Sequence, residues 1–327
     1  MLSNPFGEAY RAPESALAIA GAFANFSGCG QALNWVDDPT TMEACLRGKD
    51  AATVLAAQML AEDYILADLG TLLQIVVAWS PTIGTPYLPL RPLDAFQRGA
   101  SLDVPYMVGT TANETIIFVY EALQTSPGAY IPLGELEYDL LVGALLGPAN
   151  AAQIADYYPV PAPPPADFKV FASTPLTDGL FLCATRNATE ALYAAQPARQ
   201  SKAYHWLYSH VLAGSAALWQ GNFTECFTTV CHGSDLPELF HPRNAAIANY
   251  TAEEDALALT MQRYIAAFAR TGDPGDGGIG LQWPAYDTAT RQTVNYETAS
   301  MGGVTVISSY RAKECAWWDS TVGYLVW

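Results

Sequence analysis

The chain reads Val104-Pro105-Tyr106-Met107-Val108-Gly109-Thr110-Thr111-Ala112-Asn113-Glu114 at the start of a segment in which Glu114, Phe118 and Glu121 recur at helical spacing. The apolar run that ends at Gly109 predicts a short buried strand, and the later spacing predicts a helix. Strand, turn and helix in this order are typical of an α/β sheet. Such folds place their chemistry in the turn, so Glu114 is a candidate functional residue. Its other interpretation is an acidic side chain that only stabilises the helix N-terminus, by under about 1 kcal/mol.

The rest of the chain continues the α/β pattern. Tyr204, Trp206 and Tyr208 alternate with other residues and predict a second strand, and the β-branched residues of 304–308 predict a last one. The predicted helices cover residues 13–26, 51–61, 176–195 and 251–272. The last of these begins with Thr251-Ala252-Glu253-Glu254, which is a capping box. The expected fold class is therefore α/β, with helices flanking a central sheet.

Two proline-rich segments interrupt this pattern. Residues 79–92 contain four prolines, which excludes a helix or a central strand and predicts an ordered loop. Five more prolines crowd the segment near residues 158–166. Because the composition does not change across it, we interpret this segment as a surface loop, and residues 1–327 as part of a single domain.

The charge and hydropathy of the chain exclude some classes of function. Its 327 residues carry 15 Lys and Arg against 32 Asp and Glu, a formal charge of 15 − 32 = −17, which argues against nucleic acid as a partner. With 51% hydrophobic residues the chain can bury a large core. Its most apolar run, residues 64–79, is broken by Asp68, Gly70 and Gln74, so no membrane span is predicted.

Six cysteines and five Asn-x-Ser/Thr acceptors indicate an oxidising, secretory compartment. The acceptors are Asn25, Asn113, Asn187, Asn222 and Asn249. The N-terminus lacks the basic and apolar layout of a secretion signal. We therefore expect a secreted, disulfide-bonded glycoprotein whose signal peptide is missing from this sequence.

Among four histidines, His232 is the best candidate for proton transfer. His205 and His210 belong to an aromatic strand and its end and are interpreted as packed or surface residues. His241 precedes a proline in a loop and has no obvious partner. His232, in contrast, follows Cys231 in a polar loop.

The cysteines near His232 allow two interpretations. A metal site would combine Cys226, Cys231, His232 and His241, but this spacing matches no usual zinc motif, and adjacent Cys231 and His232 do not easily face one ion. We prefer a disulfide between Cys226 and Cys231 that leaves His232 free on a stiffened loop.

Several stretches resemble the carboxylesterase and cholinesterase family of α/β-hydrolases, known as type B carboxylesterases. Five segments resemble the family in order and approximate spacing: residues 104–118, 230–237, 249–251, 268–274 and 283–286. The first resembles the segment that carries the family's catalytic acid, and the second resembles the segment that carries its histidine. The resemblance thus implies the C-terminal part of an α/β-hydrolase fold with an incomplete central sheet.

The resemblance also implies site residues and covalent links. It implies Glu114 and His232 as the acid and base of a serine esterase, with no metal and no organic cofactor. A carboxylate oxygen of Glu114 should then lie within hydrogen-bond distance of a His232 ring nitrogen, whereas the unused nitrogen should face an opening. It further implies disulfides that join Cys29 to Cys45 and Cys183 to Cys315.

The Gly-x-Ser-x-Gly elbow that carries the family's nucleophile does not occur in these residues. The nearest approaches, around Ser101 and Ser300, each lack one of the two glycines that the strained turn requires. The opening Ser3-Asn4-Pro5 resembles sequence just after the elbow, so we expect the N-terminal half of the fold, with the serine and the oxyanion loop, to be missing.

The resemblance therefore implies a carboxylic-ester hydrolase that acts on a small-molecule ester, whereas these 327 residues alone are expected to be inactive. The alternative is a non-catalytic, cholinesterase-like adhesion or binding protein, because the family includes members without the serine. A third interpretation, an α/β domain of unknown role, would hold if Glu114 and His232 were distant in space.

Overall fold

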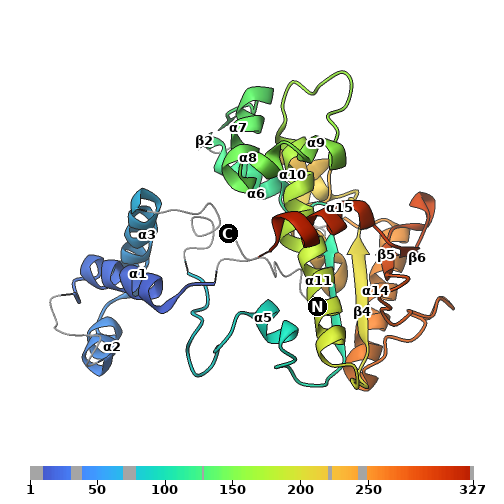
Figure 1. Cartoon of the computed structure of the whole chain (residues 1–327), viewed down its shortest axis with the longest axis horizontal. Coiled ribbons are helices and arrows are strands. Elements are labelled where there is room, and N and C mark those ends of the chain that lie inside the picture. The colour runs from blue at the N-terminus through green and yellow to red at the C-terminus, as the bar shows by residue number, and fades with distance from the viewer. Residues whose placement is uncertain are drawn as a thin grey trace. The chain divides into compact units, whose positions relative to one another are not determined.

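The computed structural model describes residues 10–30, 39–68, 79–126, 129–219, 223–241 and 249–324. Contacts divide the described residues into two compact units, residues 10–95 and residues 96–324. Three features of the sequence lie outside the described residues: the opening Ser3-Asn4-Pro5, the acceptor Asn222 and most of the apolar run 64–79. Figure 1 shows the elements of both units in chain order by colour.

The smaller unit is built from helices. They are α1 (Pro13–Phe26), α2 (Pro39–Arg47) and α3 (Ala51–Asp68), and α5 (Pro92–Gln97) crosses the boundary between the units. Ile19 of α1 packs with Ala61 of α3 in a small apolar core. The expected disulfide between Cys29 and Cys45 joins the end of α1 to α2. Residues 79–91 form no helix, as their prolines predict.

The larger unit contains a four-stranded mixed sheet with the order β1-β4-β5-β6. Its strands are β1 (Tyr106–Thr111), β4 (Ala203–Tyr208), β5 (Gln292–Tyr296) and β6 (Thr305–Ser308). The first three are parallel, with Tyr106 opposite Ala203 and Trp206 opposite Val294, and β6 is antiparallel to β5. The α/β class predicted from the sequence is confirmed.

The other elements of the larger unit surround this sheet or connect its strands (Figure 1). They are α6 (Ile116–Ala122), β2 (Gln124–Ser126), β3 (Ala129–Tyr130), α7 (Glu135–Leu146), α8 (Pro148–Ala151), α9 (Ile154–Tyr157), α10 (Lys169–Thr177), the π-helix η1 (Asp178–Leu182), α11 (Cys183–Ala195), α12 (Ser215–Leu218), the 3₁₀-helix η2 (Thr224–Phe227), α13 (Leu236–Phe240), α14 (Ala252–Thr271), the 3₁₀-helix η3 (Ala299–Met301), α15 (Ala312–Trp317) and the π-helix η4 (Trp318–Val322). The prolines between α9 and α10 lie on a mostly exposed loop. No described helix is both long and apolar enough to span a bilayer.

Helices cover both faces of the central strand β4. Its alternate residues Tyr204 and Tyr208 belong to an aromatic core with Tyr264 of α14. His205 points to the other face, where its Nε2 lies 2.8 Å from the hydroxyl of Thr189 on α11. Every residue of β4 is buried as a result, which is typical of a parallel strand covered on both sides.

Close packing between β1 and β4 requires a glycine. A Cβ atom added to Gly109 would lie 2.2 Å from the Trp206 ring, far inside van der Waals contact. Gly109 thus leaves room for the indole that links the strands to the aromatic core. The glycine that ends the apolar run in the sequence therefore lies inside the strand, which continues to Thr111.

The first turn of α14 confirms the predicted capping box. The Thr251 hydroxyl accepts a hydrogen bond from the Glu254 N–H at 3.2 Å, and a Glu254 carboxylate oxygen accepts one from the Thr251 N–H at 2.6 Å. The helix ends as predicted at Gly272, which has a φ of 76°.

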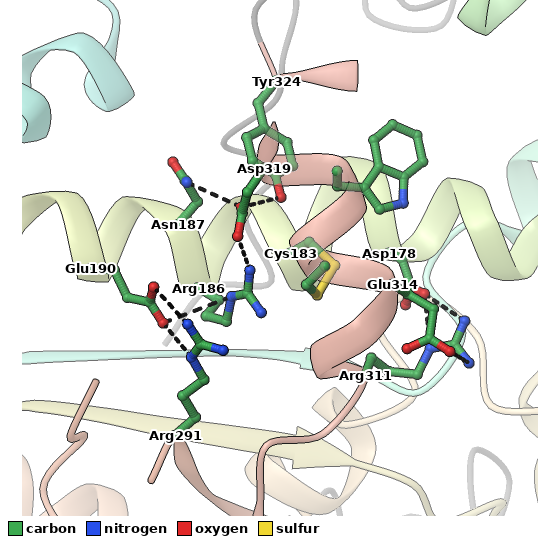
Figure 2. The surroundings of a disulfide bond; sticks show 12 residues. Asp178, Cys183, Arg186, Asn187, Glu190, Arg291, Arg311, Glu314, Asp319 and Tyr324 are labelled. Atoms are coloured by element: carbon green, nitrogen blue, oxygen red, sulfur yellow. Dashed lines mark hydrogen bonds and ion pairs between the residues drawn. A yellow bond between two sulfur atoms is a disulfide. The ribbon is translucent and has the colours of Figure 1, made fainter. Parts of the chain in front are cut away.

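The expected disulfide between Cys183 and Cys315 joins α11 to α15. Ion pairs lie on either side of it in Figure 2. Arg311 Nη2 lies 2.6 Å from an oxygen of the buried Asp178, and Arg186 pairs with Asp319. Covalent and ionic links thus fasten the closing helices to the body of the larger unit.

Candidate active site

Glu114 lies fully buried in the turn that follows β1. Its Oε1 accepts a hydrogen bond from the Thr111 N–H at 2.6 Å, and its Oε2 lies 2.6 Å from Nδ1 of His232. Its own N–H donates to the hydroxyl of Thr177 on α10, at 3.1 Å. The turn and α10 therefore hold the carboxylate in one orientation, aimed at His232.

His232 reaches Glu114 from a loop 118 positions further along the chain. The disulfide between Cys226 and Cys231 closes the segment just before it. The Ser234 hydroxyl accepts a hydrogen bond from the Cys231 N–H at 2.9 Å, and Gly233 has a φ of 79°, which strains any other residue. The loop is thus fixed by a covalent bond and a tight turn. Because Glu114 is buried and contacts His232, the interpretation that it only stabilises the helix N-terminus is wrong.

The imidazole of His232 lies near two phenylalanine rings. Its ring centroid is 5.4 Å from that of Phe118 on α6 and 5.6 Å from that of Phe181 in η1. The side chain is 36% exposed, and no described residue forms a hydrogen bond with its Nε2. Nδ1 is therefore engaged by Glu114, whereas Nε2 can take part in proton transfer.

The carboxylate changes the acidity of the imidazole. Burial lowers the pKa of His232, but the hydrogen bond and negative charge of Glu114, with a contribution from Asp235, raise it above its ordinary value overall. With Glu114 ionised, Nδ1–H is the donor and Nε2 of the neutral ring is the acceptor. An imidazole that an acid orients in this way has the geometry that a general base acting through Nε2 requires.

The other histidines occupy separate environments. His205 is buried, which lowers its pKa to about 3 and keeps the ring neutral. His210 is also buried, as the packed interpretation predicts. His241, which has no obvious partner in the sequence, has one in the structure, because its Nε2 lies 2.9 Å from Oδ1 of Asp255. This contact with Asp255, on α14, is invisible in the sequence because it joins the end of α13 to a separate helix.

The two serines closest to an elbow motif lie outside this pair. Ser300 belongs to η3, and its N–H donates to Glu253 at 2.9 Å. Ser101 lies in a loop, where its carbonyl accepts a hydrogen bond from Gln196 at 2.8 Å. Neither serine is hydrogen-bonded to His232.

The metal interpretation of the cysteine loop is wrong, and the preferred disulfide is confirmed. Cys226 and Cys231 are bonded to each other, so neither is a thiolate ligand. Within the described ranges, no group of three or more His, Cys, Asp and Glu side chains has a geometry that could hold a metal ion.

The family model described as "Carboxylesterase family" matches residues 5–318. The chain belongs to the carboxylesterase family. The mixed sheet with flanking helices is therefore part of an α/β-hydrolase fold, as the resemblance implied.

Two similar proteins come from Dictyostelium discoideum. This carboxylesterase-family chain is 30% identical to the cAMP-regulated D2 protein over 299 residues, which cover 90% of the chain and 50% of that protein. It is 30% identical to the Crystal protein over 294 residues, which cover 90% of the chain and 48% of that protein. A more distant relative is an acetylcholinesterase of Leptinotarsa decemlineata, 24% identical over 95% of the chain and 46% of that protein. The chain thus spans about half the length of these curated relatives.

The structure adds two buried acidic residues that the sequence did not single out: Asp235, beside the pair of Glu114 and His232, and Glu238 on α13. Burial and the charge of Glu114 raise the pKa of Asp235 to about 6. Glu238 of α13 is fully buried, and neither of its carboxylate oxygens has a hydrogen-bond partner in the described part of the chain. Their positions after His232 were visible in the sequence, but nothing in the pattern shows that they turn inward.

Glu238 makes the stability of the chain depend on pH. Burial raises its pKa to about 8; the nearby Tyr208 hydroxyl lowers it, and the charges of Glu254 and Glu297 raise it further. In the unfolded chain the ordinary pKa of 4.5 applies, so the folded chain binds about one more proton between pH 4.5 and 8. The contribution of Glu238 to stability therefore falls as pH rises through this window, by about 1.4 kcal/mol per pH unit and about 4 kcal/mol by pH 7.4.

We expect Glu238→Gln to remove this loss, because an amide has nearly the same shape and no charge. Urea unfolding at pH 5, 6, 7 and 8 measures it: the variant should gain stability over the wild type as pH increases. Glu137→Gln, at an exposed position of α7, is the matched control and should leave the slope unchanged. Parallel pH curves for wild type and Glu238→Gln would contradict the prediction.

Proposed function

We propose that this chain supplies the acid and the base of a serine carboxylic-ester hydrolase, with Glu114 as the acid and His232 as the base. The observation that carries the proposal is the 2.6 Å contact between Glu114 Oε2 and His232 Nδ1. Two side chains so far apart in sequence meet here at the carboxyl end of a parallel strand, with one imidazole nitrogen left for a substrate-side proton.

In the proposed reaction, a serine from outside these residues attacks the ester carbonyl. His232 Nε2 takes the hydroxyl proton as the serine oxygen bonds to the carbonyl carbon, and then gives it to the alkoxide as the ester C–O bond breaks. Water hydrolyses the acyl-serine by the same route, with His232 again first base and then acid. Glu114 keeps the imidazole in the reactive tautomer and stabilises the imidazolium.

The reaction class is tested with the 327 residues and the complete gene product side by side. We expect the complete protein to hydrolyse a short-chain aryl ester and the isolated chain to show no activity above background. The physical reason is that the chain holds a base without a nucleophile in the required elbow. Ester turnover by the isolated chain that a serine-directed phosphonate abolishes would contradict the prediction.

The same experiment separates the esterase from the non-catalytic alternative. A complete reading frame with a residue other than serine between the elbow glycines, together with an inactive full-length protein, would favour an adhesion or binding role. A serine in the elbow and a phosphonate adduct on it would favour the enzyme.

We further propose that residues 1–327 form the C-terminal portion of one carboxylesterase-type domain, made in the secretory pathway. The share of the relatives that the chain covers supports a portion of one domain, and the C-terminal placement rests on the resemblance of its acid and histidine segments. Three disulfide bonds among all six cysteines support the second, because such bonds persist in oxidising compartments.

A further inference from the structure

The Asn-x-Ser/Thr acceptors differ sharply in their structural surroundings, and the proposed reaction uses none of them. An N-linked glycan needs an asparagine amide that points into solvent, because the attached sugars are bulky and hydrophilic. Of the four acceptors within the described residues, Asn25 and Asn249 are exposed, whereas Asn113 and Asn187 are half-buried.

Asn113 is held at both ends of its amide. Its Nδ2 donates to the hydroxyl of the fully buried Ser173 at 2.9 Å. Its Oδ1 accepts hydrogen bonds from the Ile116 N–H and the Thr177 hydroxyl, each at 3.2 Å. The amide nitrogen is thus engaged at the contact between α10 and the turn of Glu114, and a sugar there would have to displace these hydrogen bonds.

Asn187 is engaged by the ion-pair cluster beside the disulfide of Cys183. Figure 2 shows its amide turned toward Asp319, and Nδ2 donates to Asp319 Oδ1 at 3.1 Å. The same carboxylate pairs with Arg186 and accepts from the Tyr324 hydroxyl at 2.7 Å. A sugar on Asn187 would displace Asp319 and break this cluster.

Asn249 has the opposite environment. It precedes α14 on an exposed connection, and its side chain has no hydrogen bond to any described residue. The next residue, Tyr250, is held in place, because its hydroxyl donates to the Pro237 carbonyl at 2.7 Å and its ring packs on His241. The backbone is therefore fixed while the Asn249 amide is free. Asn25 is likewise exposed, in the last turn of α1.

We propose that the folded chain carries N-linked glycans at Asn25 and Asn249 and at neither Asn113 nor Asn187. The donor is a polyprenyl-pyrophosphate-linked oligosaccharide. The asparagine Nδ2 forms a bond to the anomeric carbon and loses one proton, while the bond from that carbon to the pyrophosphate oxygen breaks and the polyprenyl pyrophosphate leaves. One N–H of the amide becomes one N–C bond.

The experiment compares peptides of the complete protein secreted from a eukaryotic host. A peptide N-glycosidase acting in heavy-oxygen water converts each glycosylated asparagine to a labelled aspartate, which mass spectrometry then locates. We expect label at Asn25 and Asn249 and unmodified asparagine at Asn113 and Asn187. Label at Asn113 or Asn187, or no label at Asn25 or at Asn249, would overturn the proposal. If little protein is secreted, the protease-resistant fraction of the chain translated into microsomes gives the same comparison.

Two variants separate loss of the acceptor from loss of the fold. Asn249→Gln should remove one glycan by gel mobility, whereas Thr251→Ser keeps both the acceptor motif and a capping hydroxyl and should keep the glycan. Failure of ester hydrolysis would leave this result unaffected. Absence of sugar from every acceptor would overturn this proposal together with the secretory compartment.

Discussion

Replacement of His232 by alanine is expected to lower the kcat of the complete enzyme by about 10⁵-fold to 10⁶-fold, and Glu114→Gln by about 10⁴-fold. The losses differ because His232 transfers the proton itself, whereas Glu114 only orients the imidazole ring and stabilises its protonated form. Gln in place of Glu would still fill the site but would favour the wrong tautomer at the 2.6 Å contact. KM should change little, since both groups act mainly in the transition state.

Steady-state kinetics on an aryl ester measure these losses, and the double variant should be scarcely worse than His232→Ala alone. His241→Gln is the matched control, because it breaks a His–Asp contact of 2.9 Å elsewhere in the same unit. That variant should keep near wild-type kcat. A His232→Ala enzyme with more than a tenth of wild-type kcat would contradict the proposed mechanism.

Loss of the disulfide between Cys183 and Cys315 is expected to destabilise the larger unit by about 5 kcal/mol on the chain-entropy model. The bond closes a loop with a sequence separation of 132, whereas the bond between Cys226 and Cys231 closes one of only 5. The shorter loop restricts the unfolded chain much less, so its loss should cost about 2 kcal/mol.

Urea unfolding of Cys183→Ala/Cys315→Ala and of Cys226→Ala/Cys231→Ala measures the two costs under identical conditions. Alanine suits these positions because all four cysteines are buried and a polar replacement would add a desolvation penalty. The shorter loop therefore serves as the control for the cysteine replacement itself. An equal or larger loss for Cys226 and Cys231 would contradict the entropic explanation.

Local sequence patterns predicted the elements that depend on local chemistry. The capping box at Thr251 and the glycine stop at Gly272 were both readable, because each is a contact between neighbours in the chain. The strand before Glu114 was readable from its apolar run, although the strand extends past Gly109 to Thr111. The reason is that the sheet register with β4, and not the glycine, decides where β1 ends.

Contacts between distant segments were not readable from local patterns. The meeting of Glu114 and His232 followed only from a resemblance to a family, since no local pattern records it. The position of the Phe181 ring beside His232 and the burial of Glu238 depend on contacts between segments that are distant in the chain. Their signals in the sequence are ordinary apolar and acidic residues, which on average lie in many other environments.

The carboxylate of Glu254 joins the cap of α14 to the segment that follows β4. Besides the Thr251 N–H, it accepts a hydrogen bond from the Ala213 N–H at 2.6 Å, and its Oε1 lies 3.1 Å from Nε2 of the buried His210. His210 Nδ1 in turn lies 3.3 Å from Glu297, just after β5. Fraying of the first turn of α14 would therefore also release these contacts at the ends of two strands, and we expect the three segments to open to solvent as one cooperative unit, with common amide-exchange protection.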